Sequence, residues 1–318
     1  MNRLVLLLTL ALFACAPITA PPGLTPSMPI LRGETLLLRD GLQVLVRRWT
    51  PVTTENNGDP KTIIIALHGM GDYANAFSMP GAEWAKRGIL TIAYDQRGFG
   101  RAPHPGLWAG AETMRNDLRD AVAAVKNAYP DAPVFVLGES MGGAVTLTAL
   151  EQPLDVKGVI LLAPAVWSRG DMPFHYRVAL FLAARLMPGL MLSNGAASRI
   201  VTIVPSDNIE MLQALGRDPL VHRRTRSDVL FGLTNLMDEA RTTPARLPAA
   251  PPLLVVYGAR DQIIPARPTE AVIAALGGRA TVKKYDTGYH MLLRDLSRAA
   301  PTYDIAEWVL GTAKKAAP

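Results

Sequence analysis

The chain has 318 residues, of which 49% are hydrophobic and 19% charged, and its formal net charge is +6. This length and composition allow one large α/β domain with an insertion, and they exclude a chain that is disordered throughout. The Lys and Arg residues are scattered and lack the motif context of a nucleic-acid site, so we expect no nucleic-acid partner.

The N-terminal segment is predicted to be a targeting signal. Asn2 and Arg3 precede an apolar run, Leu4–Ala14, which only Thr9 interrupts. This run is too short to cross a bilayer but matches the apolar part of a signal peptide. We therefore interpret residues 1–14 as a signal peptide.

The only cysteine, Cys15, directly follows this run, so no internal disulfide is expected. The arrangement resembles the bacterial lipoprotein signal, although Phe13 stands where a smaller residue is usual. The resemblance implies a lipidated Cys15 and a membrane-anchored lipoprotein of the bacterial cell envelope. Secretion to the periplasm and an uncleaved anchor are the alternatives. Residues 15–29 hold five prolines and are predicted to be an extended linker.

Strand and helix patterns alternate after residue 30. A hairpin is predicted from Thr35–Leu38 and Gln43–Trp49, closed around Asp40-Gly41. Strands are predicted at Thr62–Leu67, Ile89–Tyr94, Val134–Leu137, Val159–Leu162, Leu253–Tyr257 and Thr281–Tyr285, and most of them are apolar. Helices are predicted at Ala74–Lys86, Ala111–Tyr129, near Thr269–Leu276 and at Tyr303–Ala313, and a further helix follows the strand Val134–Leu137 and runs through Leu150.

This alternation predicts an α/β fold with a mostly parallel, eight-stranded sheet covered by helices on both faces. The pattern breaks at residues 165–247, which read as helical without an obvious strand. We interpret that stretch as a cap inserted over the carboxyl ends of the strands, where such sheets bind ligands. Residues 30–164 and 248–318 then form the core.

The segment Gly138-Glu139-Ser140-Met141-Gly142-Gly143 follows the predicted strand Val134–Leu137 directly. A strand that ends in Gly-x-Ser-x-Gly and turns at once into a helix is a nucleophile elbow. The turn is tight, so small residues must flank the serine, whose hydroxyl is exposed at the helix N-terminus. The pattern predicts Ser140 as a nucleophile.

A nucleophilic serine needs a base and a group that orients the base. Asp261 follows the strand Leu253–Tyr257, and His290 follows the next strand, which gives the chain order Ser, Asp, His. The sequence therefore predicts Asp261 as the acid and His290 as the base. Two other carboxylates near His290, Asp286 and Asp295, are interpreted as surface or loop residues.

Two backbone N–H groups are expected to bind the oxyanion of the reaction. One is that of Met141, after the nucleophile, and the other is that of Met70 in the loop His68-Gly69-Met70-Gly71. The tract 95–101 is assigned a structural role in the turn after its strand. No cysteine–histidine metal spacing is present, so the residues themselves indicate no metal site.

Five motifs occur in order along the chain: HGMGDY, AYDQRGFGR, GESMGG, YGARDQIIP and GYHMLLRD. Together they resemble the monoacylglycerol lipase and lysophospholipase branch of the α/β-hydrolase superfamily, which is related to the serine-aminopeptidase-type hydrolases. The resemblance spans about residues 30–315. It implies an α/β-hydrolase fold and cleavage of an acyl ester without metal or cofactor. Carried over by position, it implies the same site residues: Ser140, Asp261, His290, Met70 and Met141.

The expected substrate is lipid-like, either a monoacylglycerol or a lysophospholipid. The cap segment Met172–Met187 is apolar nearly all round and carries only Arg177 and Arg185 as charges. It could be packed on both sides inside the cap, line an acyl-chain tunnel, or face a membrane.

Three other functions are consistent with the sequence. A short-chain esterase, or a peptidase or amidase, could use the same scaffold. A substrate amine in that second case could face Glu210, Asp238 or Glu239 of the cap. The alternative from another class is a non-catalytic, lipid-binding envelope lipoprotein.

Overall fold

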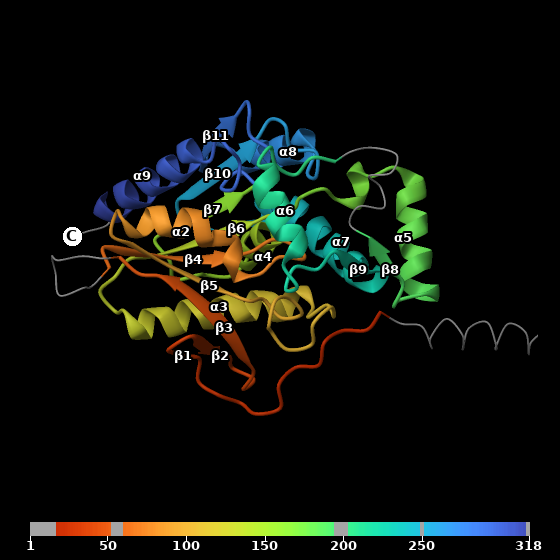
Figure 1. The fold of residues 1–318 in the computed structure, drawn as a ribbon, viewed down its shortest axis with the longest axis horizontal. Coiled ribbons are helices and arrows are strands. Elements are labelled where there is room, and N and C mark those ends of the chain that lie inside the picture. Colours follow the sequence, from red (N-terminus) through yellow and green to blue (C-terminus); the bar gives the residue numbers. More distant parts are fainter. Residues whose placement is uncertain (1–16, 52–59, 194–202, 249–250, 316–318) are drawn as a thin grey trace, which may run out of the picture.

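The computed structural model describes residues 17–51, 60–193, 203–248 and 251–315. Within these ranges a nine-stranded sheet has the order β1-β2-β3-β5-β4-β6-β7-β10-β11 (Figure 1). Its strands are β1 (Ile30–Arg32), β2 (Thr35–Leu37), β3 (Gln43–Trp49), β4 (Thr62–Leu67), β5 (Ile89–Tyr94), β6 (Val134–Glu139), β7 (Gly158–Leu162), β10 (Leu253–Gly258) and β11 (Ala280–Tyr285).

Helices cover both faces of this sheet, because apolar side chains point to both faces, as successive residues of β4 show. Ile63 and Ile65 pack into one hydrophobic core, and Ile64 and Ala66 pack into the other, as the two-residue period of a strand requires. The first core includes α3 (Ala111–Ala128), α4 (Met141–Ala149) and α8 (Ala266–Leu276), and the second includes η2 (Ala74–Phe77), α2 (Ser78–Ala85) and α9 (Ala299–Lys315).

The predicted α/β-hydrolase fold is confirmed, with one difference in the sheet. The strands from β5 to β11 in sheet order are parallel to their neighbours, whereas β3 pairs antiparallel with β5. The sheet has nine strands instead of the eight expected, because Ile30–Arg32 pairs antiparallel with β2. This strand has three residues and no fully buried position, so its sequence carries no recognisable period.

The cap elements lie between β7 and β10 in the chain. They are η3 (Arg169–Asp171), α5 (Phe174–Leu186), β8 (Met191–Ser193), α6 (Ile209–Arg217), β9 (Arg224–Arg226), α7 (Ser227–Thr242) and η5 (Thr243–Arg246). The interpretation of this stretch as free of strands is wrong, because β8 and β9 form an antiparallel ribbon. Each strand is only three residues long and is defined by its partner across the ribbon, not by a local pattern.

The cap touches the loops that follow the parallel strands. The His222 N–H donates to the Gly71 carbonyl after β4, at 2.8 Å. The Met291 N–H, in the loop after β11, donates to the Pro205 carbonyl at 3.0 Å. The cap therefore lies over the carboxyl ends of the strands, the edge at which parallel sheets bind ligands.

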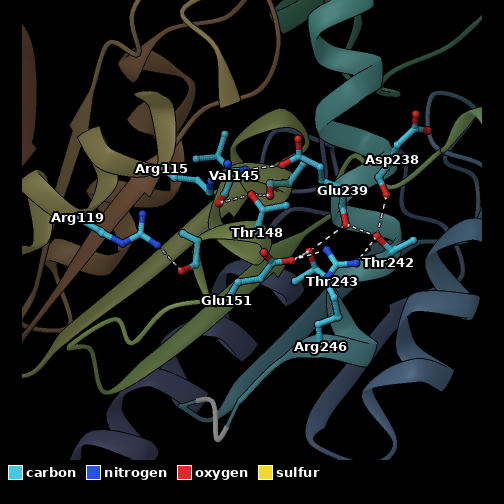
Figure 2. A network of polar contacts seen from close by, with 12 residues as sticks. Arg115, Arg119, Val145, Thr148, Glu151, Asp238, Glu239, Thr242, Thr243 and Arg246 are labelled. Carbon is cyan, nitrogen blue, oxygen red and sulfur yellow. Dashed lines mark hydrogen bonds and ion pairs between the residues drawn. The ribbon is translucent and has the colours of Figure 1, made fainter. Parts of the chain in front are cut away.

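A polar network fixes the C-terminal part of the cap to the core (Figure 2). Arg115 of α3 pairs with Glu239 of α7 at 2.6 Å. Glu151, which follows α4, accepts a hydrogen bond from the Thr243 hydroxyl at 2.9 Å and pairs with Arg246 of η5. These contacts tie α7 to α3, and η5 to the residue segment that follows α4.

Residues 17–29, part of the predicted linker, lie against the folded body (Figure 1). The Ile18 N–H donates to Asp228 of α7 at 3.3 Å, and the Ala20 N–H donates to the Trp108 carbonyl at 2.8 Å. The predicted signal segment and Cys15 lie outside the described residues. Among the residues that are described, no helix has the length and apolar character needed to span a membrane.

Candidate active site

Ser140 occupies the turn between β6 and α4. Its backbone angles are φ +52° and ψ −114°, in the region that residues other than glycine rarely adopt. Such strain is typical of functional turns and is held by the surrounding structure. The Ser140 N–H donates to the Leu162 carbonyl of β7 at 2.9 Å, and the Ser140 carbonyl accepts from the Ala165 N–H at 2.9 Å. Neighbouring strand ends thus fix the turn.

The elbow packs directly on β4, and this contact explains the need for Gly142. A Cβ atom at this position would lie 2.4 Å from the carbonyl oxygen of Leu67. Glycine lets the first turn of α4 approach the strand and places the free N–H groups of the helix beside Ser140. One of these first-turn groups belongs to Met141, the predicted oxyanion donor.

The loop His68-Gly69-Met70-Gly71 passes against the nucleophile. A Cβ atom on Gly69 would lie 3.2 Å from Ser140 Cβ and 3.8 Å from Ser140 Oγ. The structure therefore brings this loop and Ser140 together, as an oxyanion site requires.

His68 fixes the orientation of the peptide in that loop. Its Nε2 accepts a hydrogen bond from the Gln96 N–H at 3.0 Å, so its Nδ1 carries a proton and donates to the Gly69 carbonyl at 2.8 Å. Burial lowers the pKa of His68, which keeps the ring neutral. The C=O of Gly69 and the N–H of Met70 share one planar trans peptide and point in opposite directions. The Met70 N–H is thus directed away from His68.

Asp261 and His290 are brought together by adjacent parallel strands. The loops after β10 and β11 are joined by a hydrogen bond from the Arg260 N–H to the Gly288 carbonyl, at 2.9 Å. His290 Nδ1 lies 2.7 Å from Asp261 Oδ2. The other carboxylate oxygen of Asp261 accepts the N–H groups of Ile263 and Ile264 at 2.8 and 2.9 Å, which orients the carboxylate.

The chemistry of His290 follows from its surroundings. Because the Asp261 carboxylate accepts from Nδ1, the Nε2 of His290 has the free lone pair that a base needs. Burial lowers the pKa of His290, but the charge of Asp261 and the hydrogen bond to it outweigh this effect. The net result is a pKa above the ordinary value of 6.5, as expected for a base paired with a carboxylate.

The other two carboxylates near His290 have different surroundings. Asp286 is exposed, as expected. Asp295 is fully buried, and it accepts hydrogen bonds from the Ser206 hydroxyl at 2.6 Å and the Tyr289 N–H at 2.8 Å. Its environment is therefore not that of a surface residue: it shapes the loop that carries His290.

Sequence reasoning missed three buried charged residues at this edge of the sheet: Asp72, Glu139 and Arg294. Arg294 donates to Asp72 at 2.6 Å and to Glu139 at 3.3 Å. Each belongs to a motif that was recognised for another residue. The sequence feature that could have indicated them is a charged residue among the small and apolar residues of each motif. No group of three or more metal-ligating side chains occurs within the described ranges.

The fold and site define a class. A mostly parallel sheet with a serine at a strained strand–helix turn, and a paired Asp and His after later strands, is the architecture of the ester-hydrolysing α/β-hydrolases. A family model described as serine aminopeptidase S33 matches residues 58–297, and the chain belongs to this family.

Individual proteins agree with this assignment. The chain is 28% identical to the monoglyceride lipase of Mus musculus over 299 residues, covering 92% of this chain and 95% of that protein. It is 26% identical over 275 residues to the monoacylglycerol lipase of Mycolicibacterium smegmatis, covering 85% and 94%. The crystal structure of Paleococcus ferrophilus monoacylglycerol lipase matches in fold, with a TM-score of 0.70, 21% identity and coverage of 85% and 99%. The predicted monoacylglycerol lipase-like family is thereby confirmed.

Proposed function

We propose that the protein is a serine hydrolase that cleaves carboxylic esters of lipid-like substrates, monoacylglycerols or lysophospholipids, through an acyl-enzyme intermediate. The observation that carries this proposal is the 2.7 Å pair of His290 and Asp261 at the same sheet edge as the strained Ser140. The sequence and structure relatives named above support the same class of reaction.

The reaction would proceed in two halves. Ser140 Oγ attacks the ester carbonyl while His290 Nε2 accepts its proton, and the N–H groups of Met70 and Met141 bind the oxyanion. His290 then protonates the leaving alcohol as the C–O bond breaks, which leaves the acyl group on Ser140. Water attacks this ester by the same route, with His290 as base, and releases the fatty acid. Asp261 stabilises the imidazolium in both halves.

The surface of α5 supports a lipid-like substrate. Only Ala184 of this helix is buried, so of the three possibilities left open by the sequence, packing on both sides inside the cap does not hold. The helix rests on α7 through Phe181 and Phe231, whose ring centroids are 6.4 Å apart. Its exposed apolar side chains are Phe174, Tyr176, Val178, Phe181, Leu182 and Leu186. A surface patch of this kind marks a site for lipid or for a partner.

The path of the N-terminal residues supports membrane anchoring. Pro17 and Ile18 line the same cavity as Phe231, the residue on which α5 packs. The chain thus enters the folded body close to the contact between α5 and α7. A lipidated Cys15, two residues before Pro17, would hold that face at the surface of a bilayer. We therefore propose a membrane-anchored lipoprotein of the bacterial cell envelope.

Lipidation is tested by metabolic labelling. We expect a labelled fatty acid to be incorporated into the wild-type protein and not into Cys15→Ser. Equal incorporation into both proteins would contradict the anchor while leaving the esterase proposal intact.

An amide substrate is the nearest alternative, because the family takes its description from aminopeptidases. Of the three cap carboxylates considered for a substrate amine, two have other partners. Glu239 pairs with Arg115 at 2.6 Å, and Asp238 accepts from the Arg169 N–H at 2.7 Å. Glu210 is exposed on α6. The paired carboxylates favour the ester over the amide.

The deciding experiment is a turnover screen of the purified protein. The panel contains monoacylglycerols and lysophospholipids of graded chain length, short-chain esters, and aminoacyl amides. We expect the highest kcat/KM on one of the two lipid classes. Faster amide turnover would contradict the esterase proposal, and a preference for short esters would contradict the lipid substrate. Absence of Ser140-dependent labelling by a fluorophosphonate in folded protein would support a non-catalytic lipid-binding role.

A further inference from the structure

A buried ion cluster joins the loops that carry the proposed catalytic residues. The guanidinium of Arg294 donates from Nη1 to Asp72 Oδ2 at 2.6 Å, and from Nη2 to the two carboxylate oxygens of Glu139 at 3.3 and 3.4 Å. All three residues are at most 6% exposed. Burying charged groups is costly, so three of them together at this position require an explanation.

Each member of the cluster belongs to a different part of the site. Glu139 is the last residue of β6 and precedes Ser140. Asp72 follows the oxyanion loop. Arg294 lies four residues after His290, in a turn closed by a 2.7 Å hydrogen bond from its N–H to the Met291 carbonyl. One guanidinium therefore connects the elbow, the oxyanion loop and the histidine loop.

The cluster reaches the oxyanion peptide through Asp72. The Asp72 N–H donates to the Gly69 carbonyl at 3.3 Å, the same carbonyl that His68 holds from its Nδ1. The side chain of Asp72 also accepts the Tyr73 N–H at 2.8 Å. A shift of Asp72 would therefore turn the peptide whose other end is the Met70 N–H.

The cluster also contributes to the charge near the base. Two carboxylates against one guanidinium leave one net negative charge, which favours the imidazolium that forms at His290 during the reaction. For the pKa of His290, burial and Asp261 dominate, Glu139 adds to the increase and Arg294 opposes it. Asp295, which accepts the Tyr289 N–H, is the further carboxylate of this loop.

We propose that Arg294, Asp72 and Glu139 are positioning residues of the esterase reaction. They hold the three loops in fixed positions relative to one another, and their charges contribute to the electrostatic environment of the His290 imidazole. This inference rests on the proposed serine mechanism, and none of the three residues is assigned contact with the substrate.

Two substitutions separate charge from geometry. Glu139→Gln keeps the shape but removes a negative charge, so the acidic limb of kcat/KM against pH should move to lower pH, on the order of half a pH unit. Arg294→Lys keeps the charge but loses the planar fork that reaches both carboxylates. Its kcat should fall about tenfold, with the acidic limb in place and KM within about twofold, since only the positioning of the loops is lost.

A second cluster, which also pairs one arginine with two carboxylates, provides the control. Arg97 is paired with Asp117 of α3 at 2.7 Å and with Asp40 of the β2–β3 turn at 2.6 Å, and it connects none of the three catalytic loops through these contacts. Asp117→Asn also removes one carboxylate from a buried arginine cluster. It should lower the unfolding temperature and leave kcat and the acidic limb unchanged.

The outcomes are separable. An unmoved acidic limb in Glu139→Gln, or a wild-type kcat in Arg294→Lys, overturns the proposal, as does an equal change in Asp117→Asn. If Arg294→Lys does not fold, Asp72→Asn replaces it, and a wild-type kcat in that folded variant counts against the positioning role. Failure of the proposed function itself is recognised differently, because the wild-type protein then hydrolyses no ester and is not labelled by a fluorophosphonate.

Discussion

The sheet edge and the cap helix α5 are built in opposite ways. Every residue of β4, β6, β7 and β10 is buried. Backbone hydrogen bonds join the turn after β6 to the end of β7 and its loop, and the loop after β10 to the loop after β11. In α5 only Ala184 is buried, and the helix rests mainly on α7. The comparison teaches that the proposed catalytic residues are placed by a buried interior, whereas α5 offers an exposed apolar surface, on which we propose that substrate preference depends.

The largest expected effect is on the nucleophile. Ser140 and the cap residue Ser168 are both 9% exposed, but only Ser140 lies at the elbow. Ser140→Ala should lower kcat about 10⁴–10⁶-fold because no acyl-enzyme can form. Ser168→Ala, which removes a hydrogen bond to Asp171, should leave kcat within about twofold. Comparable losses in the two variants would contradict the division between core and cap.

The acid should come next. Asp261→Asn should lower kcat on the order of 10⁴-fold, because His290 loses the partner that fixes its tautomer. In the wild-type protein His290 has a raised pKa, so kcat/KM should fall on the acidic side with a midpoint above pH 6.5. Without the Asp261 charge the pKa of His290 drops and the midpoint should move to lower pH. Rate profiles across pH measure both effects, and an unmoved midpoint would argue against Asp261 as the partner.

A smaller loss is expected in the oxyanion loop. In Gly69→Ala the new Cβ would lie 3.2 Å from Ser140 Cβ, so the loop must shift and kcat should drop about 10²–10³-fold. The cap residue Gly170 is the control, since a Cβ there would make only an ordinary 3.5 Å contact with the Ser168 hydroxyl. Steady-state kinetics on a soluble ester distinguishes the two, and a normal kcat in Gly69→Ala would contradict the prediction that the close contact with Ser140 displaces the oxyanion loop.

The smallest expected effect concerns the free energy of unfolding, to which the sheet and α5 should contribute differently. Leu161→Ala in the fully buried β7 should lower the free energy of unfolding by about 2–5 kcal/mol through lost burial and a cavity. Leu182→Ala on α5, where the residue is 47% exposed, should change it by no more than about 0.5 kcal/mol. Chemical denaturation measures both. A large loss in the Leu182 variant would show that α5 is integral to the folded core.

Local patterns in the sequence were sufficient for much of the fold. The hairpin of β2 and β3, the buried strands and the amphipathic α3 were predicted close to their observed bounds. Each depends on a period of two or 3.6 residues that is readable within one element. The order of Ser140, Asp261 and His290 also follows from motifs at strand ends. Their catalytic roles stay predictions, which the variants above test.

The remaining features required the tertiary structure, because they depend on partners distant in the chain. Arg294 and Asp72 are separated by 222 positions, and neither motif indicates that the two side chains meet in the interior. The sequence around Asp295 predicts a surface or loop carboxylate, because its hydrogen-bond partner Ser206 is 89 positions away in the chain. The exposure of α5 was open as well, since an apolar helix has the same sequence whether a neighbour covers one of its faces or several.

The sequence by itself determined the class of fold and the candidate nucleophile, acid and base. The nucleophile elbow can be recognised from neighbouring residues alone, because its tight turn requires small residues on both sides of the serine. Only the tertiary structure decided which charges are buried together, how the oxyanion peptide is oriented and which face of α5 is exposed. These properties are set by free energies of burial and pairing between distant segments, and no local pattern encodes them.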